Sequence, residues 1–241
     1  MNISFKNKTV VITGGTRGIG KAIAECFLEC EANVIITGRS EKKPLSINSN
    51  INYCSLDLES KASVDKFLNF LSSLKKIDAF VNNAGINLIN DLENIKDEDF
   101  DKVLSINLRS PFILSKYVSN LMKDEGGKIV NISSIWSKIT KKGRVTYIAS
   151  KSGLAGLTRG LATDLAEHNI LVNTISPGFV ETELTRKSLS EFEIKNLYEK
   201  IPLERFAQAT EIANFVVFIC SDLNTYMTGQ NIVIDGGYSN V

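Results

Sequence analysis

The chain has 241 residues, of which 43% are hydrophobic, and its 28 basic residues nearly balance its 27 acidic ones for a net charge of +1. This length and hydrophobic share suffice for one domain with a large core. The balanced charge gives no electrostatic basis for binding nucleic acid, and no apolar run approaches the ~18 residues that a membrane span requires.

Strand-like and helical segments alternate along the chain. In order we expect a strand at 8–13, a helix at 18–30, strands at 33–38 and 51–57, a helix at 63–74, a strand and loop at 77–85, helical structure over 97–124 with Pro111 near a helix start or a break, a strand at 127–134, a helix at 147–167, a strand at 169–178, a polar helical segment at 182–200, a buried helix at 212–220 and a strand at 231–237. Such alternation predicts an α/β, Rossmann-type doubly wound parallel sheet with helices on both faces, in a single domain over residues 1–241. Ligands of such sheets bind beyond the carboxyl ends of the strands.

The chain has four cysteines and one histidine. We expect Cys26, Cys30, Cys54 and Cys220 to be buried reduced thiols, which fits a cytoplasmic protein, and the N-terminal segment lacks the apolar core of a secretory signal. The cysteines have no second ligand pair at zinc spacing, so no metal site is predicted. His168 lies at the end of a predicted helix, where it interacts favourably with the helix dipole. Proton transfer is therefore expected to depend on another group.

A glycine-rich turn, TGGTRGIG (13–20), follows the first strand directly and opens the first helix. Gly14 permits a tight turn, and Gly18 and Gly20 allow backbone to approach a pyrophosphate and the helix to pack on the strand. The helix N-terminus then offers free N–H groups and a positive dipole to phosphate. The turn predicts dinucleotide binding, although glycine turns between strands and helices also occur without a ligand.

The residues after the second strand favour NADP(H) over NAD(H). NAD-selective sites usually place a carboxylate there to bind the ribose hydroxyls, whereas this strand ends in Gly38 and Arg39. Arg17 lies inside the glycine turn, and two guanidinium groups suit a ribose 2′-phosphate. The alternative is that both arginines are solvated surface residues.

Four polar residues form an ordered set of catalytic candidates. Tyr147 and Lys151 are four residues apart on a predicted helix, and Ser134 precedes Tyr147 by thirteen residues at the end of a strand. A nearby ammonium favours the phenolate of a tyrosine that would otherwise have a pKa near 10, and a serine hydroxyl can polarise a carbonyl oxygen. Asn107 could add a backbone or water link to Lys151. Taken singly, each residue is as easily an ordinary surface pair, cap or turn.

The glycine turn, NNAG (82–85), Asn107, Ser134, YIASK (147–151) and SPG (176–178) together resemble the short-chain dehydrogenase/reductase family over residues 8–237. The resemblance implies a catalytic tetrad of Asn107, Ser134, Tyr147 and Lys151. It also implies cofactor contacts with the adenine, riboses, phosphates and carboxamide. The cofactor-binding residues so expected are Gly14, Thr16, Arg17, Gly18, Ile19, Gly20, Arg39, Asp57, Leu58, Asn83, Ala84, Gly85, Tyr147, Lys151, Pro177, Gly178, Val180 and Thr182.

The C-terminal stretch 201–237 resembles the subgroup of bacterial 3-oxoacyl-acyl-carrier-protein reductases, which implies a homotetramer and a ketone or secondary alcohol as the small-molecule substrate. This pattern is shared by dehydrogenases of sugars, polyols and steroids, and nucleotide-linked keto-sugars also remain open as substrates. Sugar dehydratases and epimerases usually have longer chains. A non-catalytic NADP-binding sensor or scaffold is the alternative of another class, and the complete tetrad argues against it.

Two segments are expected to border the substrate. The segment 135–146 contains Lys138, Lys141, Lys142 and Arg144 without an acidic residue, and we hypothesise that it attracts an anionic substrate, with Trp136 as an apolar wall. A solvated basic turn is the alternative. The polar segment 181–200 is interpreted as a mobile substrate lid, against the alternative of a fixed surface helix.

Overall fold

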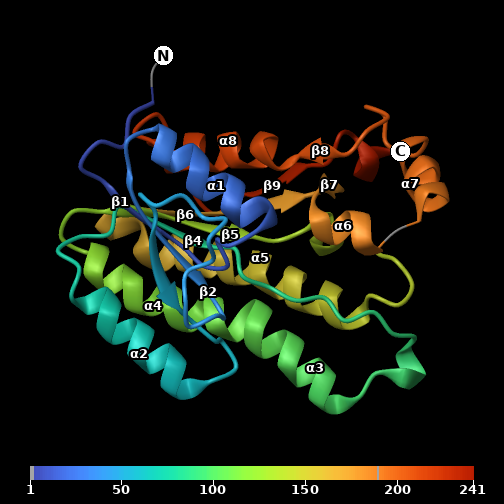
Figure 1. The fold of residues 1–241 in the computed structure, drawn as a ribbon, viewed down its shortest axis with the longest axis horizontal. Helices are drawn as coiled ribbons and strands as arrows, with labels where there is room; N and C mark the ends of the chain where they lie inside the picture. The colour runs from blue at the N-terminus through green and yellow to red at the C-terminus, as the bar shows by residue number, and fades with distance from the viewer. Residues whose placement is uncertain (1–2, 189) are drawn as a thin grey trace.

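A seven-stranded parallel sheet forms the centre of the protein in the computed structural model, which describes residues 3–188 and 190–241 (Figure 1). Its strand order is β3-β2-β1-β4-β5-β6-β9. The strands are β1 (Thr9–Ile12), β2 (Asn33–Gly38), β3 (Asn52–Ser55), β4 (Ala79–Asn82), β5 (Gly127–Ile132), β6 (Ile170–Pro177) and β9 (Asn231–Ile234). This arrangement confirms the predicted Rossmann-type doubly wound sheet.

Helices cover both faces of the sheet (Figure 1). The helices are α1 (Gly18–Glu29), α2 (Lys61–Ser72), α3 (Asp97–Leu104), α4 (Ser110–Met122), α5 (Val145–Leu165) and α8 (Ala209–Cys220). Apolar side chains of α1 and α8 pack in one core with the sheet, and those of α2, α4 and α5 pack in a second core on the opposite face. Because both faces are covered, every residue of β4 and β6 is buried.

The strand order reverses between β1 and β4. From β1 the chain builds outward through β2 and β3, and from β4 it builds in the other direction. The loops that follow these two neighbouring strands therefore diverge and leave a crevice at their carboxyl ends. This crevice is formed by the glycine turn after β1 and by residues 83–86 after β4.

The helical stretch predicted over 97–124 is interrupted by one π-helical turn, Ser105–Arg109, between α3 and α4. Pro111 lies in the first turn of α4, directly after the π turn, at the break in the helix that its position suggested. Hydrophobic periodicity does not specify a π turn, so the sequence predicted the helices but not the widened turn. Asn107 lies within it.

The polar segment 182–200 forms two short helices, α6 (Glu183–Ser188) and α7 (Glu191–Tyr198). The side chain of Ser190 caps α7 in a reciprocal arrangement with Glu193. The small parallel pair β7 (Val180–Glu181) and β8 (Ala207–Gln208) was not predicted, since two residues carry no periodic pattern. The remaining short helical turns are Leu92–Asn94, Ile135–Ser137, Ala166–His168 and Tyr238–Asn240.

The four cysteines are free thiols, but only two are buried. Cys26 and Cys220 lie in the core, whereas Cys30 and Cys54 are partly exposed, so the expectation of burial was wrong for the latter two. His168 ends the short helical turn that extends α5, with its Nε2 3.7 Å from Glu167 Oε1. Within residues 3–188 and 190–241, His, Cys, Asp and Glu form no cluster suited to a metal ion, and no helix is long and apolar enough to cross a membrane.

Candidate active site

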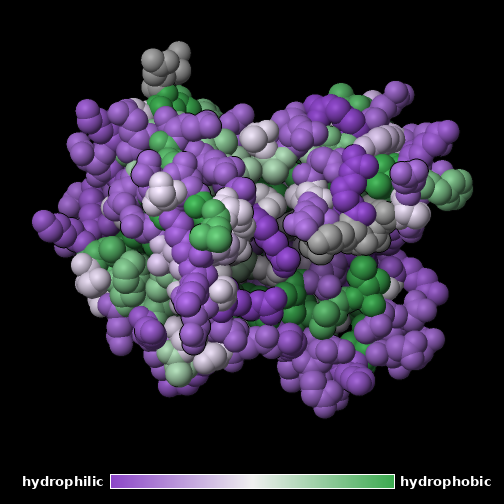
Figure 2. All heavy atoms as spheres, in the orientation of Figure 1, coloured by the Kyte–Doolittle hydropathy of each residue, from purple (hydrophilic) through white to green (hydrophobic). Residues whose placement is uncertain are grey.

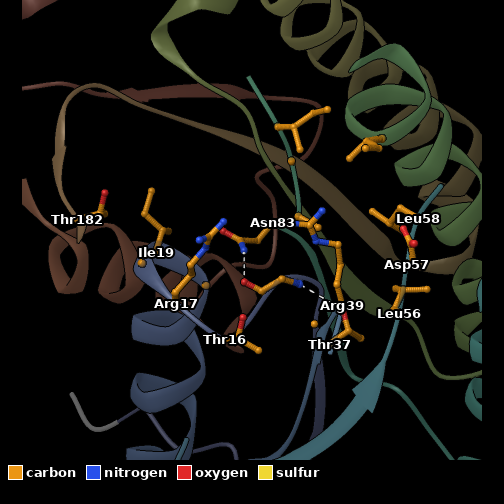
Figure 3. Close-up of a pocket in the computed structure, with 18 of the residues that line it drawn as sticks. Thr16, Arg17, Ile19, Thr37, Arg39, Leu56, Asp57, Leu58, Asn83 and Thr182 are labelled. Atoms are coloured by element: carbon orange, nitrogen blue, oxygen red, sulfur yellow. Dashed lines mark hydrogen bonds between the residues drawn. The ribbon is translucent and has the colours of Figure 1, made fainter. Parts of the chain in front are cut away.

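Asn83 joins the glycine turn to the loop that follows β4. Its side-chain Nδ2 donates hydrogen bonds to the carbonyl oxygens of Thr13 at 2.9 Å and Gly14 at 3.0 Å. Figure 3 shows Asn83 beside the glycine turn. A Cβ atom on Gly20 would lie 2.3 Å from that nitrogen and 2.4 Å from the Gly14 oxygen. Glycine is therefore required at position 20, because any side chain would collide with the backbone of the turn.

The N-terminus of α1 is suited to an anion. The residue before the helix is Arg17, whose side chain makes no capping hydrogen bond, and the first turn contains no acidic residue. The first N–H groups of a helix have no partner within it and carry the positive end of the helix dipole. The turn and the helix start thus form a phosphate cradle, and this is where the residues fit the pyrophosphate of a dinucleotide.

A cavity of about 320 Å³ opens over this cradle. It is lined by thirteen residues expected from the sequence, namely Gly14, Thr16, Arg17, Gly18, Ile19, Gly20, Arg39, Asp57, Leu58, Asn83, Ala84, Gly85 and Thr182 (Figure 3). The sequence missed further lining residues, which are Thr37, Gly38, Leu56, Glu59, Ile86, Ile106 and Glu183. Gly38, Leu56, Glu59, Ile86 and Glu183 are sequence neighbours of predicted cofactor residues, and this adjacency is the signal that could have found them.

Five of the predicted cofactor residues lie outside the lining of this cavity. Tyr147 and Lys151 are on α5, and Pro177 is the last residue of β6. Gly178 packs against the end of β9, because its N–H donates to the Ile234 oxygen at 2.8 Å. Val180 is buried in β7. A role for these five residues in cofactor binding stays a prediction.

Asn107 is fully buried, and its side chain is bound to the loop after β4. Its Oδ1 accepts a hydrogen bond from the Ile86 N–H at 2.9 Å, and its Nδ2 donates to the Ile86 oxygen at 2.8 Å and to Ser150 Oγ at 3.1 Å. Among the described residues it has no direct hydrogen bond to Lys151. Asn107 therefore fixes the position of this loop, and any proton relay through it would need a further carrier.

Lys151 is almost completely buried beneath the site. Its Nζ donates to the Ile132 carbonyl oxygen at 2.8 Å and lies 5.6 Å from the centre of the Tyr147 ring. Burial lowers the pKa of the Lys151 ammonium to about 8. A Cβ atom on Gly85 would lie 3.5 Å from this ammonium and 3.1 Å from Asn107 Oδ1. Because Gly85 also lines the cavity, the Lys151 ammonium lies beside the cavity that opens over the phosphate cradle.

Tyr147 and Ser134 face each other between α5 and the end of β5. Burial raises the pKa of the Tyr147 phenol, while its hydrogen bond with Ser134 and the charge of Arg144 act in the opposite direction. Lys151, to which the sequence assigned that lowering effect, is not among these causes. Its Nζ donates to the Ile132 oxygen and lies 5.6 Å from the centre of the Tyr147 ring, so its effect on the phenol stays a prediction. Ser134 Oγ also accepts a hydrogen bond from the Trp136 N–H at 3.3 Å.

Comparison with known proteins agrees with this geometry. A family model described as enoyl-(acyl carrier protein) reductase matches residues 14–239. The 3-oxoacyl-[acyl-carrier-protein] reductases of Rickettsia felis and Aquifex aeolicus are 38% and 39% identical to this chain, with 98% of the chain and at least 98% of each relative covered.

Solved structures match over the full length of the chain. A short-chain alcohol dehydrogenase from Sinorhizobium meliloti has a TM-score of 0.93 at 32% identity, covering 100% of this chain and 99% of that one. A gluconate 5-dehydrogenase from Burkholderia cenocepacia, solved with NADP and tartrate, has a TM-score of 0.93 at 28% identity, covering 100% of this chain and 98% of that one.

A phosphate cradle at the sheet's switch point, next to a serine, a tyrosine and a buried lysine, defines a nicotinamide-dependent oxidoreductase. The chain belongs to the short-chain dehydrogenase/reductase family. The resemblance noted from the motifs is thereby confirmed, and with it an enzyme that interconverts a ketone and a secondary alcohol by hydride transfer.

Substitution of Gly20 tests the phosphate cradle. We expect Gly20→Ala to raise the Kd for NADPH by about tenfold or more, because the added carbon must displace the turn. Fluorescence titration with NADPH measures this. Gly160→Ala is the matched control, since Gly160 lies in α5 with no atom within 4 Å of an added Cβ. Equal affinities for the two variants would show that the turn does not hold the dinucleotide.

Proposed function

We propose that this enzyme is an NADP(H)-dependent ketone reductase in which Asn107, Ser134, Tyr147 and Lys151 act as the catalytic tetrad. The observation that carries the proposal is the placing of the Ser134 and Tyr147 hydroxyls beside a buried lysine that adjoins the dinucleotide cavity. Nicotinamide, when bound, supplies the hydride to the carbonyl carbon.

Ser134 and Tyr147 stabilise the negative charge that develops on the carbonyl oxygen of the substrate. Ser134 donates a hydrogen bond to this oxygen, and Tyr147 gives it the phenolic proton. Lys151 then faces the resulting phenolate with a positive charge and is close enough to the cavity to bind ribose hydroxyls. Asn107 acts on this chemistry through the loop at Ile86, which it holds with two hydrogen bonds.

Two exposed arginines support the preference for NADP(H). Arg17 and Arg39 both line the cavity, from the glycine turn and from the residue after β2 (Figure 3). Neither forms an ion pair with a carboxylate among the described residues. The last residue of β2 is Gly38, so this strand ends without an acid that would bind ribose hydroxyls and repel a 2′-phosphate.

A 3-oxoacyl thioester is the first substrate class to test, because the relatives with that activity cover the whole chain at 38–39% identity. Exposed apolar side chains near the start of α5, Ile89 and Val145, would contact an acyl chain. Hydrophobic atoms also gather on the surface between α3 and α6 (Figure 2). A polyol or sugar acid is the second class, supported by the gluconate 5-dehydrogenase of similar structure.

We also propose that residues 181–200 act as a lid over the cofactor. Thr182 and Glu183 line the cavity, and α6 and α7 follow them directly. Leu189 lies outside the described residues. The single domain over residues 1–241, the homotetramer and the cytoplasmic location implied by the family resemblance remain further proposals.

Removing the Tyr147 hydroxyl tests its role as the acid. We expect Tyr147→Phe to lower kcat for ketone reduction by about a hundredfold or more with little change in the Kd for NADPH. NADPH consumption at 340 nm with an acetoacetyl thioester measures the rate. Tyr226→Phe is the control, because Tyr226 is exposed on the surface. A fully active Tyr147→Phe enzyme would refute the assignment.

Arg39→Ala tests cofactor preference. Loss of a charged contact to the 2′-phosphate should raise the Kd for NADPH by about tenfold to a hundredfold. The Kd for NADH, which lacks this phosphate, should stay within about twofold and serves as the internal control. An equal loss for both dinucleotides would mean that Arg39 acts on the fold rather than on the phosphate.

The lowered pKa of Lys151 predicts the pH dependence of reduction. The ammonium is present below a pKa of about 8 and is lost as the pH rises through it, so kcat should fall above about pH 8. Tyr147 remains protonated in this range because burial raises the pKa of its phenol. In Lys151→Arg the charge persists, and any remaining activity should lose this alkaline decline. A wild-type rate that stays constant to pH 10 would contradict the role.

A further inference from the structure

Arg144 is the residue that precedes α5, and it lies beside the reacting groups. Its guanidinium carbon is 6.0 Å from the centre of the Trp136 ring, and its charge opposes the effect of burial on the pKa of Tyr147. Tyr147 follows three residues later, about one helical turn away. Arg144 therefore contributes a positive charge at the side of the site where the substrate carbonyl must lie.

The ring under Arg144 is fixed by its neighbours. Trp136 is buried, its backbone N–H donates to Ser134 Oγ at 3.3 Å, and its ring meets Phe179 edge-on at 6.4 Å. A cation over an indole face is attracted to the ring, and this contact does not use the N–H donors of the guanidinium.

The other cations of this segment differ from Arg144. Lys142 is exposed and pairs with Asp91 at 3.4 Å. The pKa of the Glu193 carboxyl is lowered by hydrogen bonds from Ser190 and, to a smaller extent, by the charge of Lys141. Lys141 therefore has a carboxylate near it. Lys138 is exposed as well. The sequence suggested that all four cations act together, whereas in the structure the three lysines are exposed and Arg144 alone is half-buried.

Arg144 is half-buried, and burial lowers the pKa of its guanidinium. Within residues 3–188 and 190–241, no carboxylate forms an ion pair with it. A partly desolvated charge without a counter-ion is unfavourable unless the site uses it. The residue before Arg144 is Gly143, which has a left-handed φ of 76°. A Cβ atom there would lie 3.3 Å from Ile89 Cγ2, so glycine allows the chain to turn close to Ile89 before it reaches Arg144.

We infer that Arg144 binds an anionic oxygen group, a carboxylate or a phosphate, on the substrate whose carbonyl carbon reacts beside Tyr147. This inference rests on the proposed function and specifies its substrate class. A guanidinium presents paired N–H donors that match either group in a bidentate fashion. Arg144 precedes Tyr147 by three residues at the start of α5, so an anion bound by its guanidinium lies close to the carbonyl that Tyr147 protonates.

Anion binding by Arg144 favours compact keto acids and keto phosphates over the 3-oxoacyl thioesters that sequence identity to the relatives puts first. The reacting ketone of a 3-oxoacyl thioester has a neutral thioester carbonyl next to it, and its phosphate lies at the far end of the pantetheine arm. Such a substrate would leave Arg144 without an anion at the required distance. Arg144 is thus a specificity-determining residue of the site.

Binding is measured first, by the fluorescence of Trp136, the only tryptophan of the chain. The enzyme with bound NADP⁺ is titrated with acetoacetate and its methyl ester, and with dihydroxyacetone phosphate and dihydroxyacetone. We expect saturable binding for at least one anion and a Kd at least about tenfold weaker for its neutral counterpart. Comparison of the two anions distinguishes carboxylate from phosphate recognition.

Arg144→Gln should weaken binding of the preferred anion by about tenfold or more and leave the neutral counterpart within about twofold. In NADPH-coupled kinetics the same variant should raise KM for the anionic ketone selectively, whereas Arg144→Lys should recover part of the affinity. Lys142→Gln removes one charge from the same segment, and Arg159→Gln removes an exposed arginine from α5. Both controls should stay within about twofold.

Three results overturn the inference: no saturable binding of either anion, an equal effect of Arg144→Gln on charged and neutral ketones, or an equal effect of Lys142→Gln. The last would indicate a general attraction by the segment. If the wild-type enzyme reduces none of the ketones or an acetoacetyl thioester, the proposed function fails. The fluorescence titration then still decides whether Arg144 binds an anion, so the two failures are distinguishable.

Discussion

The amide of Asn83 is the contact on which the site depends. It bonds to the carbonyl oxygens of Thr13 and Gly14, and the Thr13 hydroxyl accepts hydrogen bonds from the N–H groups of Asn83 at 3.0 Å and Ala84 at 3.1 Å. These bonds join two loops that a doubly wound sheet would otherwise let diverge. The loops after β1 and β4 are thereby fixed relative to each other, and the start of α1 is aimed into the cavity between them.

The catalytic groups are attached to the same framework. Gly85 and Ile86 continue the loop from Asn83, and Asn107 holds Ile86 by both its backbone N–H and its oxygen. Lys151 is anchored to the end of β5 through the Ile132 oxygen. Hydrogen bonds thus fix the loop of residues 83–86 to the glycine turn and to Asn107, and fix Lys151 to β5. These side chains are already held in position before a substrate binds. Binding therefore requires little ordering of the protein, which favours the alignment of the reacting groups.

The sequence allowed the sheet and the cradle to be predicted for identifiable reasons. β4 and β6 are buried on both faces, so they appear as apolar runs, and the glycine turn must have glycines where backbone approaches backbone. The π turn and the β7–β8 pair could not be predicted, since neither leaves a periodic pattern. The effect of Lys151 on the Tyr147 pKa stays a prediction, because only tertiary structure shows where an ammonium points, and this one donates to the Ile132 oxygen.

The π turn at Ser105–Arg109 also limits how this segment can vary in length. Such a turn holds one residue more than an α-helical turn, and each residue rotates a helix by about 100°. A deletion that restored regular α-helix would turn Asn107 away from Ile86, while α3 and α4 would both keep their amphipathic patterns. Alignments of relatives should therefore tolerate gaps before α3 and after α4 much better than between them.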